Sequence, residues 1–204
     1  MNTRPYGFTL IELLIVLAVT ALLLFVGLPG MITWIQNMQI RTSAEGLQAG
    51  LQLARAEALR RNTLVRFQLV DTLTSACVLS PNGTNWIVSM QDPTGLCDVA
   101  EIDPDPNAPP ATRLAPLAIQ KRSGAEATPN AVVAAAGGAT TLTFNGLGRV
   151  TGPTPITQIA VSNSGGPCQP AGRMRCLQLN ISSGGQVRMC DPIVTDATDP
   201  RFCN

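Results

Sequence analysis

The feature that most constrains this chain is an apolar run near its amino end, residues 8–28. Within this run only Thr9, Glu12, Thr20 and Gly27 are not apolar. At about 1.5 Å per residue, a helix over this run would span roughly 31 Å, which is close to the hydrocarbon thickness of a bilayer. The sequence therefore predicts a transmembrane helix at residues 8–28.

The residues on either side of the run predict whether it is cleaved off and how it is oriented in the membrane. A cleavable secretory signal needs a small-x-small site after its apolar core, and here the sequence continues Leu-Pro-Gly-Met-Ile-Thr-Trp. A signal anchor that is retained in the protein fits better. The short polar segment in front carries Arg4, so the amino end is expected in the cytoplasm and the remainder of the chain outside it.

Glu12 is an unusual residue for such a run. An unpaired carboxylate in hydrocarbon costs several kcal/mol, and residues 8–28 contain no lysine or arginine to pair with it. A cut in front of Phe8 would create an α-amino group about one helical turn from Glu12. That amine, from the same chain or from a neighbouring subunit, is the expected partner of the carboxylate.

The sequence Gly-Phe-Thr-Leu-Ile-Glu at residues 7–12, followed by a long apolar run, resembles the class III signal of type IV pilins and pseudopilins. The resemblance implies a leader at residues 1–7, cleavage between Gly7 and Phe8 by prepilin peptidase, and N-methylation of Phe8. It implies that Glu12 pairs with the terminal amine of an adjacent subunit during assembly. It also implies a helix kink at Pro29 and Gly30. An ordinary signal anchor is the alternative interpretation.

Residues 29–62 predict an amphipathic continuation of the helix. Four apolar residues recur at the spacing of one helical face: Leu47, Leu51, Ala54 and Ala58. This face is expected to pack on a sheet. Gly46 and Gly50 are expected to weaken the helix locally, and Pro29-Gly30 to kink or partly melt it.

Residues 51–67, LQLARAEALRRNTLVRF, resemble the FimT/FimU and GspH group of minor pilins and pseudopilins. The shared pattern is a helix that ends in Ala-Arg-x-Glu-Ala-x-x-Arg-Asn and continues directly into a strand. For the charged residues of this pattern we expect a solvated helix face with pairs three and four residues apart. These residues are Arg55, Glu57, Arg60 and Arg61.

Residues 63–204 predict a β-rich head with short local connections, and therefore antiparallel sheets. Strands are expected at residues 64–70, 77–79, 85–91, 140–145, 156–162, 176–182 and 186–190. Turns are expected at 81–83, 145–148 and 183–185. Residues 103–113 and 123–139 are expected to be insertions between strands. The predicted fold class is α+β, a long amino-terminal helix packed on an antiparallel β-rich head, which is the pilin fold.

The cysteines predict disulfides in an exported domain. All six lie after the apolar run and none forms a CxxC pair, although buried free thiols are the alternative. Turn-rich intervening sequence favours sequential pairing, among fifteen possible combinations. The pairs would be Cys77–Cys97, Cys168–Cys176 and Cys190–Cys203.

The sequence gives little support for catalysis. It has no histidine, which removes histidine-based catalysis and most zinc sites. Its acidic pairs lie in proline-rich loops, and no nucleophile or phosphate-loop motif is present. We therefore expect neither an enzyme, nor a cofactor, nor a bound metal.

Three arginines form a candidate DNA-binding group: Arg173, Arg175 and Arg188. Residues 172–175 read Gly-Arg-Met-Arg, and such an element near the carboxyl end is associated with DNA binding in FimT-type pilins. The usual family position corresponds instead to residues 181–188, where Gln186 replaces the first arginine. The alternative interpretation is that these arginines are exposed hairpin residues that keep a sheet edge soluble.

Together the two resemblances imply a minor type IV pilin that takes part in pilus initiation or forms the pilus tip. A pseudopilin of a type II secretion system is the second possibility, and DNA uptake the third. The implied partners are other minor and major pilins or pseudopilins, the inner membrane, and prepilin peptidase. The protein would be a single-pass protein of the bacterial inner membrane with a periplasmic head, extracellular once assembled in a pilus.

Overall fold

The computed structural model describes residues 9–101, 115–124 and 128–203, apart from the side chains at 26–29. The chain divides into two compact units, residues 1–35 and residues 36–204. Gly7 and Phe8 lie outside the described residues. Within these ranges one long helix, α1 (Leu10–Arg61), precedes a series of short strands and one 3-10 turn, η2 (Ala136–Gly138).

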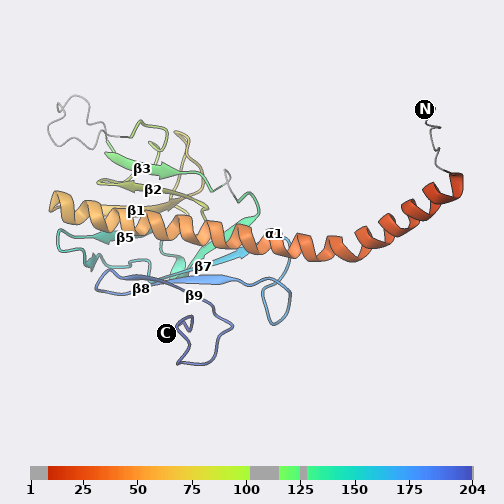
Figure 1. Ribbon diagram of the computed structural model, residues 1–204. Coiled ribbons are helices and arrows are strands. Elements are labelled where there is room, and N and C mark those ends of the chain that lie inside the picture. The colour runs from red at the N-terminus through yellow and green to blue at the C-terminus, as the bar shows by residue number, and fades with distance from the viewer. Residues whose placement is uncertain (1–8, 102–114, 125–127, 204) are drawn as a thin grey trace, which may run out of the picture. The chain divides into compact units, whose positions relative to one another are not determined.

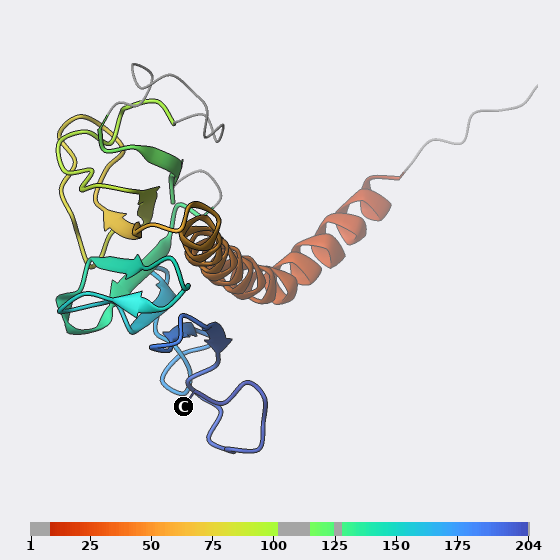
Figure 2. The same ribbon diagram turned by 90° about the vertical axis from the view of Figure 1, so that its left-hand side faces the viewer.

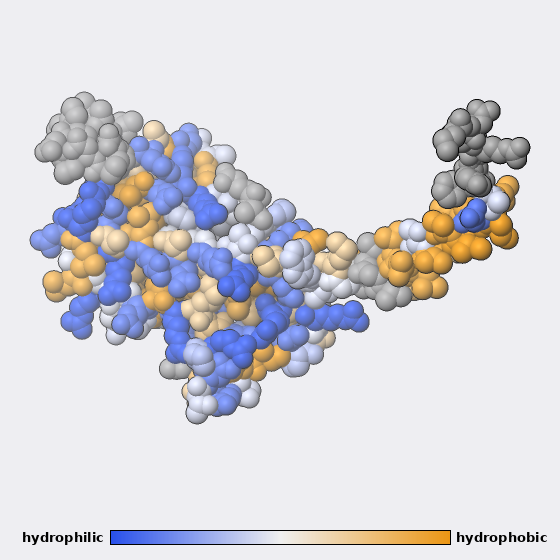
Figure 3. Space-filling view, viewed as in Figure 1, coloured by the Kyte–Doolittle hydropathy of each residue, from blue (hydrophilic) through white to orange (hydrophobic). Residues whose placement is uncertain are grey.

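The amino-terminal unit consists of the first half of α1, and its apolar side chains are exposed. Leu10 and Phe25 are 80% and 83% exposed, and the large apolar residues between them are more than half exposed. Figure 3 shows this stretch as largely orange, with a few paler or blue residues among the apolar ones. By length and composition this stretch can cross a membrane, with a mean hydropathy of 2.8. The backbone remains helical through Pro29 and Gly30, so the predicted partial melting is wrong. The kink stays a prediction.

In the second unit, α1 buries one face, as the spacing of its apolar residues predicts. Leu47, Leu51, Ala54 and Ala58 are at most 2% exposed, and Ile40 and Ala44 extend the same face toward the amino end. This face joins the strands of two sheets in one hydrophobic core. Figures 1 and 2 show this part of α1 lying beside both sheets. The predicted packing of the helix on a sheet is confirmed.

The first sheet has the strand order β3-β2-β1-β5-β6, and its neighbouring strands pair antiparallel. Its strands are β1 (Val65–Val70), β2 (Asn85–Ser89), β3 (Ala118–Arg122), β5 (Thr141–Phe144) and β6 (Val150–Thr151). In the central strand β1, Phe67 pairs with Val88 of β2 on one side and with Leu142 of β5 on the other. All three side chains are fully buried and belong to the same hydrophobic core as the buried face of α1.

The second sheet has the strand order β4-β7-β8-β9 and is also antiparallel. Its strands are β4 (Ala131–Ala135), β7 (Gln158–Asn163), β8 (Leu177–Ile181) and β9 (Val187–Cys190). The α+β prediction, with antiparallel sheets, is confirmed. The predicted turns at 145–148 and 183–185 close the β5–β6 and β8–β9 hairpins through Gly148 N–H to Asn145 O and Gly185 N–H to Ser182 O, both 2.8 Å.

Three details of the strand prediction are wrong. Residues 123–139 contain β4, whose alternating buried and exposed residues include three alanines and therefore little of the bulk that marks a strand. β3 and β6 were also absent from the prediction. Residues 77–79 form no strand, because only Leu79 makes a β-bridge, with Val70.

Three disulfides fix loops at the periphery of the head: Cys77–Cys97, Cys168–Cys176 and Cys190–Cys203. Cys77 and Cys97 are 1% exposed and belong to a second small core with Val70, Ile87 and Ala118. Lys121 holds the chain next to this core. Its ammonium group donates to three consecutive carbonyls, of Cys97 (3.2 Å), Asp98 (3.2 Å) and Val99 (2.8 Å).

Gly50 has a different role from the local weakening that the sequence predicts. A Cβ at this position would lie 2.9 Å from Phe67 Cε2 and 3.0 Å from Trp86 Cζ2 and Cη2. The two rings themselves pack with their centroids 5.7 Å apart. Gly50 therefore allows α1 to approach β1 and β2 more closely than any residue with a side chain would.

Candidate functional sites

The amino end of α1 carries a reciprocal cap formed by Thr9 and Glu12. The Glu12 carboxylate accepts hydrogen bonds from the Thr9 backbone N–H (3.0 Å) and from the Thr9 hydroxyl (2.9 Å). In return, the Glu12 N–H donates to Thr9 Oγ1 at 3.4 Å. This is a capping box, in which two side chains satisfy N–H groups that the first helical turn leaves free. The Thr-x-x-Glu spacing in front of an apolar run is the sequence signal that predicts this cap.

The cap partly compensates the carboxylate of Glu12 with hydrogen bonds from its own chain. Within a single chain its carboxylate already has two donors, so the acid is partly compensated before any second subunit arrives. An ionised carboxylate offers about four lone-pair sites, and the cap occupies only two of them. Glu12 thus retains acceptor capacity for an additional cationic donor.

The carboxyl end of α1 carries the charged pattern noted in the sequence. Glu57 accepts hydrogen bonds from Arg60 (2.8 Å) and Arg61 (2.7 Å). Partial burial acts to raise the pKa of Glu57, but the hydrogen bonds and charges of Arg60 and Arg61 outweigh it and hold the pKa below its ordinary value. The expected pairs three and four residues apart are therefore present.

Arg55 makes a contact that its position on the helix did not predict. Its Nε donates at 3.1 Å to the carbonyl of Gly148, 93 residues further along the chain. Gly148 has a φ of +70°, and a Cβ there would lie 3.1 Å from Arg55 Nε and 3.3 Å from both methyl groups of Leu59. Arg55 therefore ties the β5–β6 turn to α1, with glycine providing both the backbone conformation and the space.

The three arginines of the DNA-binding hypothesis differ in their surroundings. Arg175 forms an ion pair at 2.9 Å with Asp191, whose side chain is only 6% exposed. Arg188 donates to the carbonyl of Pro200 in the carboxyl-terminal loop. Arg173 is exposed. Two of the three guanidinium groups are thus engaged by the protein's own acceptors, and DNA binding stays a prediction.

The loop between β7 and β8, which contains Arg173 and Arg175, is fastened to α1 by amide side chains. The backbone N–H of Arg175 donates to Asn37 Oδ1 at 2.8 Å, and Asn163 at the end of β7 donates to Gln39 Oε1 at 2.7 Å. Asn163 is 3% exposed and Gln39 is half-buried, so the hydrogen bond satisfies a buried amide at a partly buried contact. The loop is thereby held on the helix at both of its ends.

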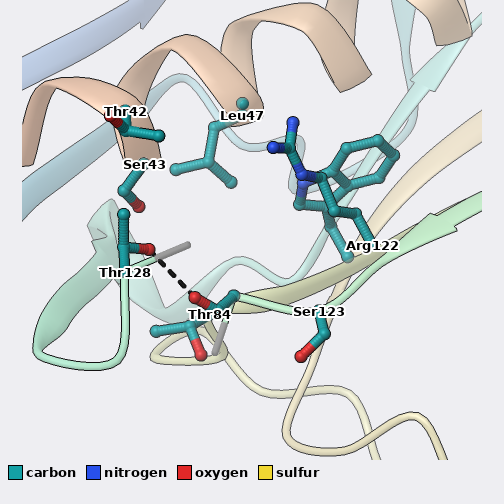
Figure 4. A pocket seen from close by; sticks show the side chains of 10 residues that line it. Thr42, Ser43, Leu47, Thr84, Arg122, Ser123 and Thr128 are labelled. Carbon is teal, nitrogen blue, oxygen red and sulfur yellow. Dashed lines mark hydrogen bonds between the residues drawn. The ribbon is translucent and has the colours of Figure 1, made fainter. Parts of the chain in front are cut away.

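A small cavity lies between α1 and the β2–β3 side of the first sheet (Figure 4). It is lined by hydroxyl groups, among them those of Ser43 and Thr128, and by the guanidinium of Arg122. Its volume is about 20 Å³, which is about the space of one water molecule. Thr128 directs its hydroxyl to the carbonyl of Gly124 (2.9 Å). The cavity is too small for a cofactor.

A larger open groove lies between the last turns of α1 and the β8–β9 hairpin, with a volume of about 420 Å³. The groove residues are Gln52, Arg55, Ala56, Leu59, Gly185, Gln186 and Val187. In the described part of the chain, no cluster of three or more His, Cys, Asp or Glu side chains is arranged to hold a metal ion.

Comparison with known proteins gives two family matches. Residues 43–190 match the model of the family described as type II transport protein GspH. Residues 3–28 match the model of the prokaryotic N-terminal methylation motif. No curated protein matches the sequence.

Two crystal structures of the type IV minor pilin FimU from Pseudomonas aeruginosa are similar to this chain. Both are 17% identical to it in sequence. One alignment covers 75% of this chain and 97% of FimU with a TM-score of 0.44. The other covers 78% and 97% with a TM-score of 0.47.

Proposed function

The chain belongs to the GspH family, a family of minor pilins and pseudopilins, and from this premise we propose that it is a minor type IV pilin of the FimT/FimU type. It acts as a structural subunit that takes part in initiating the pilus or in forming its tip. It does so without catalysis, since the family is one of structural subunits. The match to the N-terminal methylation motif supports membrane anchoring and processing of the amino end.

The observation that carries this proposal is the carboxylate of Glu12 at the start of an exposed apolar helix. In a lipid environment a charge is tolerated when it is paired or hydrogen-bonded. The cap from Thr9 supplies hydrogen bonds but no positive charge. A neighbouring subunit with a free amino-terminal amine would supply that charge, so docking of the two subunits is favoured over separate insertion in the bilayer.

Processing provides such an amine. Prepilin peptidase would cut between Gly7 and Phe8, and methylation of the new terminus keeps its positive charge. Before assembly the protein would lie in the inner membrane as a single-pass protein with its head in the periplasm. Its partners are other minor and major pilins, and after assembly its head would be extracellular.

A set of three variants tests the charge of Glu12 separately from its cap. Glu12→Gln keeps an acceptor at the third helical position, where glutamine also forms capping boxes, but removes the charge. Glu12→Val removes both. Thr20→Val is the matched control, because it deletes from the same apolar run a polar side chain whose hydroxyl donates to Val16 O of its own helix.

We expect all three variants to insert in the membrane, and both Glu12 variants to enter pili about tenfold less often than the wild type or more, because charge-assisted hydrogen bonds are the strong ones. Immunoblots of sheared pili and membrane fractions measure both quantities. Normal incorporation of Glu12→Gln would show that the charge is not what docks the subunit.

The alternative function is that of a pseudopilin in a type II secretion system, which the description of the matching family favours. Deletion of the gene separates the two functions. Loss of piliation and twitching, with protein secretion intact, supports the pilin; loss of exoprotein secretion with normal pili supports the pseudopilin.

A further inference from the structure

We propose that the groove between α1 and the β8–β9 hairpin binds a partner polypeptide that presents a carboxylate beside an aliphatic side chain. The first argument is the state of Arg55. Its Nε is fixed on the carbonyl of Gly148 at 3.1 Å. In the part of the chain that the structure describes, its two terminal nitrogens have no hydrogen-bond partner, although the residue lines the groove.

A guanidinium held in this way is prepared for a carboxylate. Its remaining N–H groups form a planar fork that matches two carboxylate oxygens. Because Arg55 is half-buried and tethered, little side-chain freedom remains to be lost when a ligand binds. The chain's own acids do not fill this role, since no acidic side chain is among the groove residues.

The apolar residues of the groove favour a ligand with an aliphatic side chain next to its carboxylate. Gln52, Arg55, Ala56 and Leu59 are spaced i, i+3, i+4 and i+7 along α1, so they form one stripe on the helix. Leu59 is 49% exposed. Together with Ala56 and Val187 of β9 it gives the groove an apolar wall. An aliphatic side chain next to the acid would bury this wall.

The charge around the groove also favours an acidic partner. The last turns of α1 and the adjoining β5–β6 hairpin carry four arginines and one glutamate: Arg55, Arg60, Arg61, Arg149 and Glu57. Glu57 is already paired with Arg60 and Arg61. The surface therefore has an excess of positive charge, which attracts an acidic segment and raises the rate of encounter.

The shape of the groove favours a protein partner over nucleic acid. A phosphate backbone is held by several cations in a row, whereas this groove contains one arginine and an apolar wall. Its volume of about 420 Å³ is within the range of sites that bury a small molecule or a few side chains. For a subunit that assembles with other pilins, the occupant would be a segment of a neighbouring subunit; this identification rests on the proposed function, whereas the binding chemistry does not.

The test uses the full chain in detergent micelles and two fluorescein-labelled peptides that differ in one group. One is Gly-Leu-Glu-Leu-Gly and the other Gly-Leu-Gln-Leu-Gly, both with blocked ends. Fluorescence anisotropy measures the dissociation constants. We expect the glutamate peptide to bind at least about tenfold more tightly, because hydrogen bonds to a charged group are roughly twice as strong as neutral ones. Equal binding of the two peptides overturns the proposal.

Variants place the interaction in the groove. Arg55→Gln should weaken binding of the glutamate peptide by about tenfold or more. Arg41→Gln, on the same helix but exposed and paired with Glu45, should leave binding unchanged. Gln186→Glu adds a competing carboxylate at the groove and leaves the Arg55–Gly148 hydrogen bond intact, so it should abolish binding even if Arg55→Gln fails to fold.

A labelled DNA duplex is the final arm. Binding of the duplex that depends on Arg55, without a preference for the glutamate peptide, overturns the proposal in favour of a phosphate site. The peptide assay and the gene deletion fail independently. If the purified protein binds the glutamate peptide but deletion of the gene leaves piliation normal, the groove is established and the pilus function is refuted.

Discussion

Two glycines on the buried side of α1 should respond in opposite directions to the same substitution. In an open helix, Gly→Ala stabilises by about 1 kcal/mol because alanine has the higher helix propensity. At Gly50 the added methyl would lie 2.9 Å from Phe67 Cε2 and 3.0 Å from Trp86 Cζ2 and Cη2. Both rings are at least 96% buried, so neither can move away without disturbing the core.

The two effects at Gly50 oppose each other. Overpacking in a core costs about 1–3 kcal/mol, which exceeds the gain in helix propensity, so we expect Gly50→Ala to lower the free energy of unfolding by about 1 kcal/mol. For a protein of this size that corresponds to a fall in Tm of about 2–4 °C.

Gly46, one turn earlier, is the matched control. A methyl there would meet Arg122 Nη1 at 3.3 Å, which is the far end of a flexible and exposed side chain. Gly46→Ala should therefore keep most of the propensity gain and raise Tm by about 2–4 °C. Thermal unfolding of the oxidised protein in detergent, followed by tryptophan fluorescence, measures both. If Gly50→Ala is as stable as Gly46→Ala, the close approach of α1 to the aromatic pair is not what requires glycine.

Two further predictions concern charged groups in the head. Lys121→Met removes the ammonium from the three carbonyls of residues 97–99, so we expect about 1–3 kcal/mol less stability and faster amide exchange in that segment. The neighbouring Arg122→Met should show neither effect; similar changes in both variants would contradict the role of Lys121. Hydrogen bonds from Arg201 lower the pKa of Asp199 from 3.8 to about 2. Its contribution to stability is therefore complete above about pH 4 and is lost as the pH falls toward 2, so the Tm difference between wild type and Asp199→Asn should shrink over that range. A difference that is constant down to pH 2 would refute this.

The sequence predicted those parts of the fold in which one repeated pattern determines the structure. The spacing of Leu47, Leu51, Ala54 and Ala58 was enough to identify the buried face of α1. The sequence did not predict β4, because small residues such as Ala131 and Ala135 give little sign of a buried strand. The strand forms through its pairing with β7, which is distant in sequence. β3 consists largely of polar residues at the edge of its sheet and shows no apolar alternation.

The candidate sites, like the strands, were predictable where they depend on local sequence and not where they depend on contacts between distant residues. The apolar run and Glu12 were evident in the sequence because they depend on local order alone. The role of Arg55 was not, since its partner Gly148 is 93 residues away and is a backbone carbonyl, which no side-chain pattern can reveal. For Arg175 the sequence suggested either DNA binding or an exposed hairpin position, and it could not show that the fold brings this residue to the buried carboxylate of Asp191.

The disulfides have a consequence for how the head acquires its bonds. They join consecutive cysteines, with separations of 20, 8 and 13 residues, and therefore none encloses another. If the head crosses the membrane in the order of its sequence, starting from the end of α1, each cysteine pair reaches the oxidising compartment before the next one does. Simple oxidation in order of arrival then yields the native set, and no rearrangement of bonds by an isomerase is required for it.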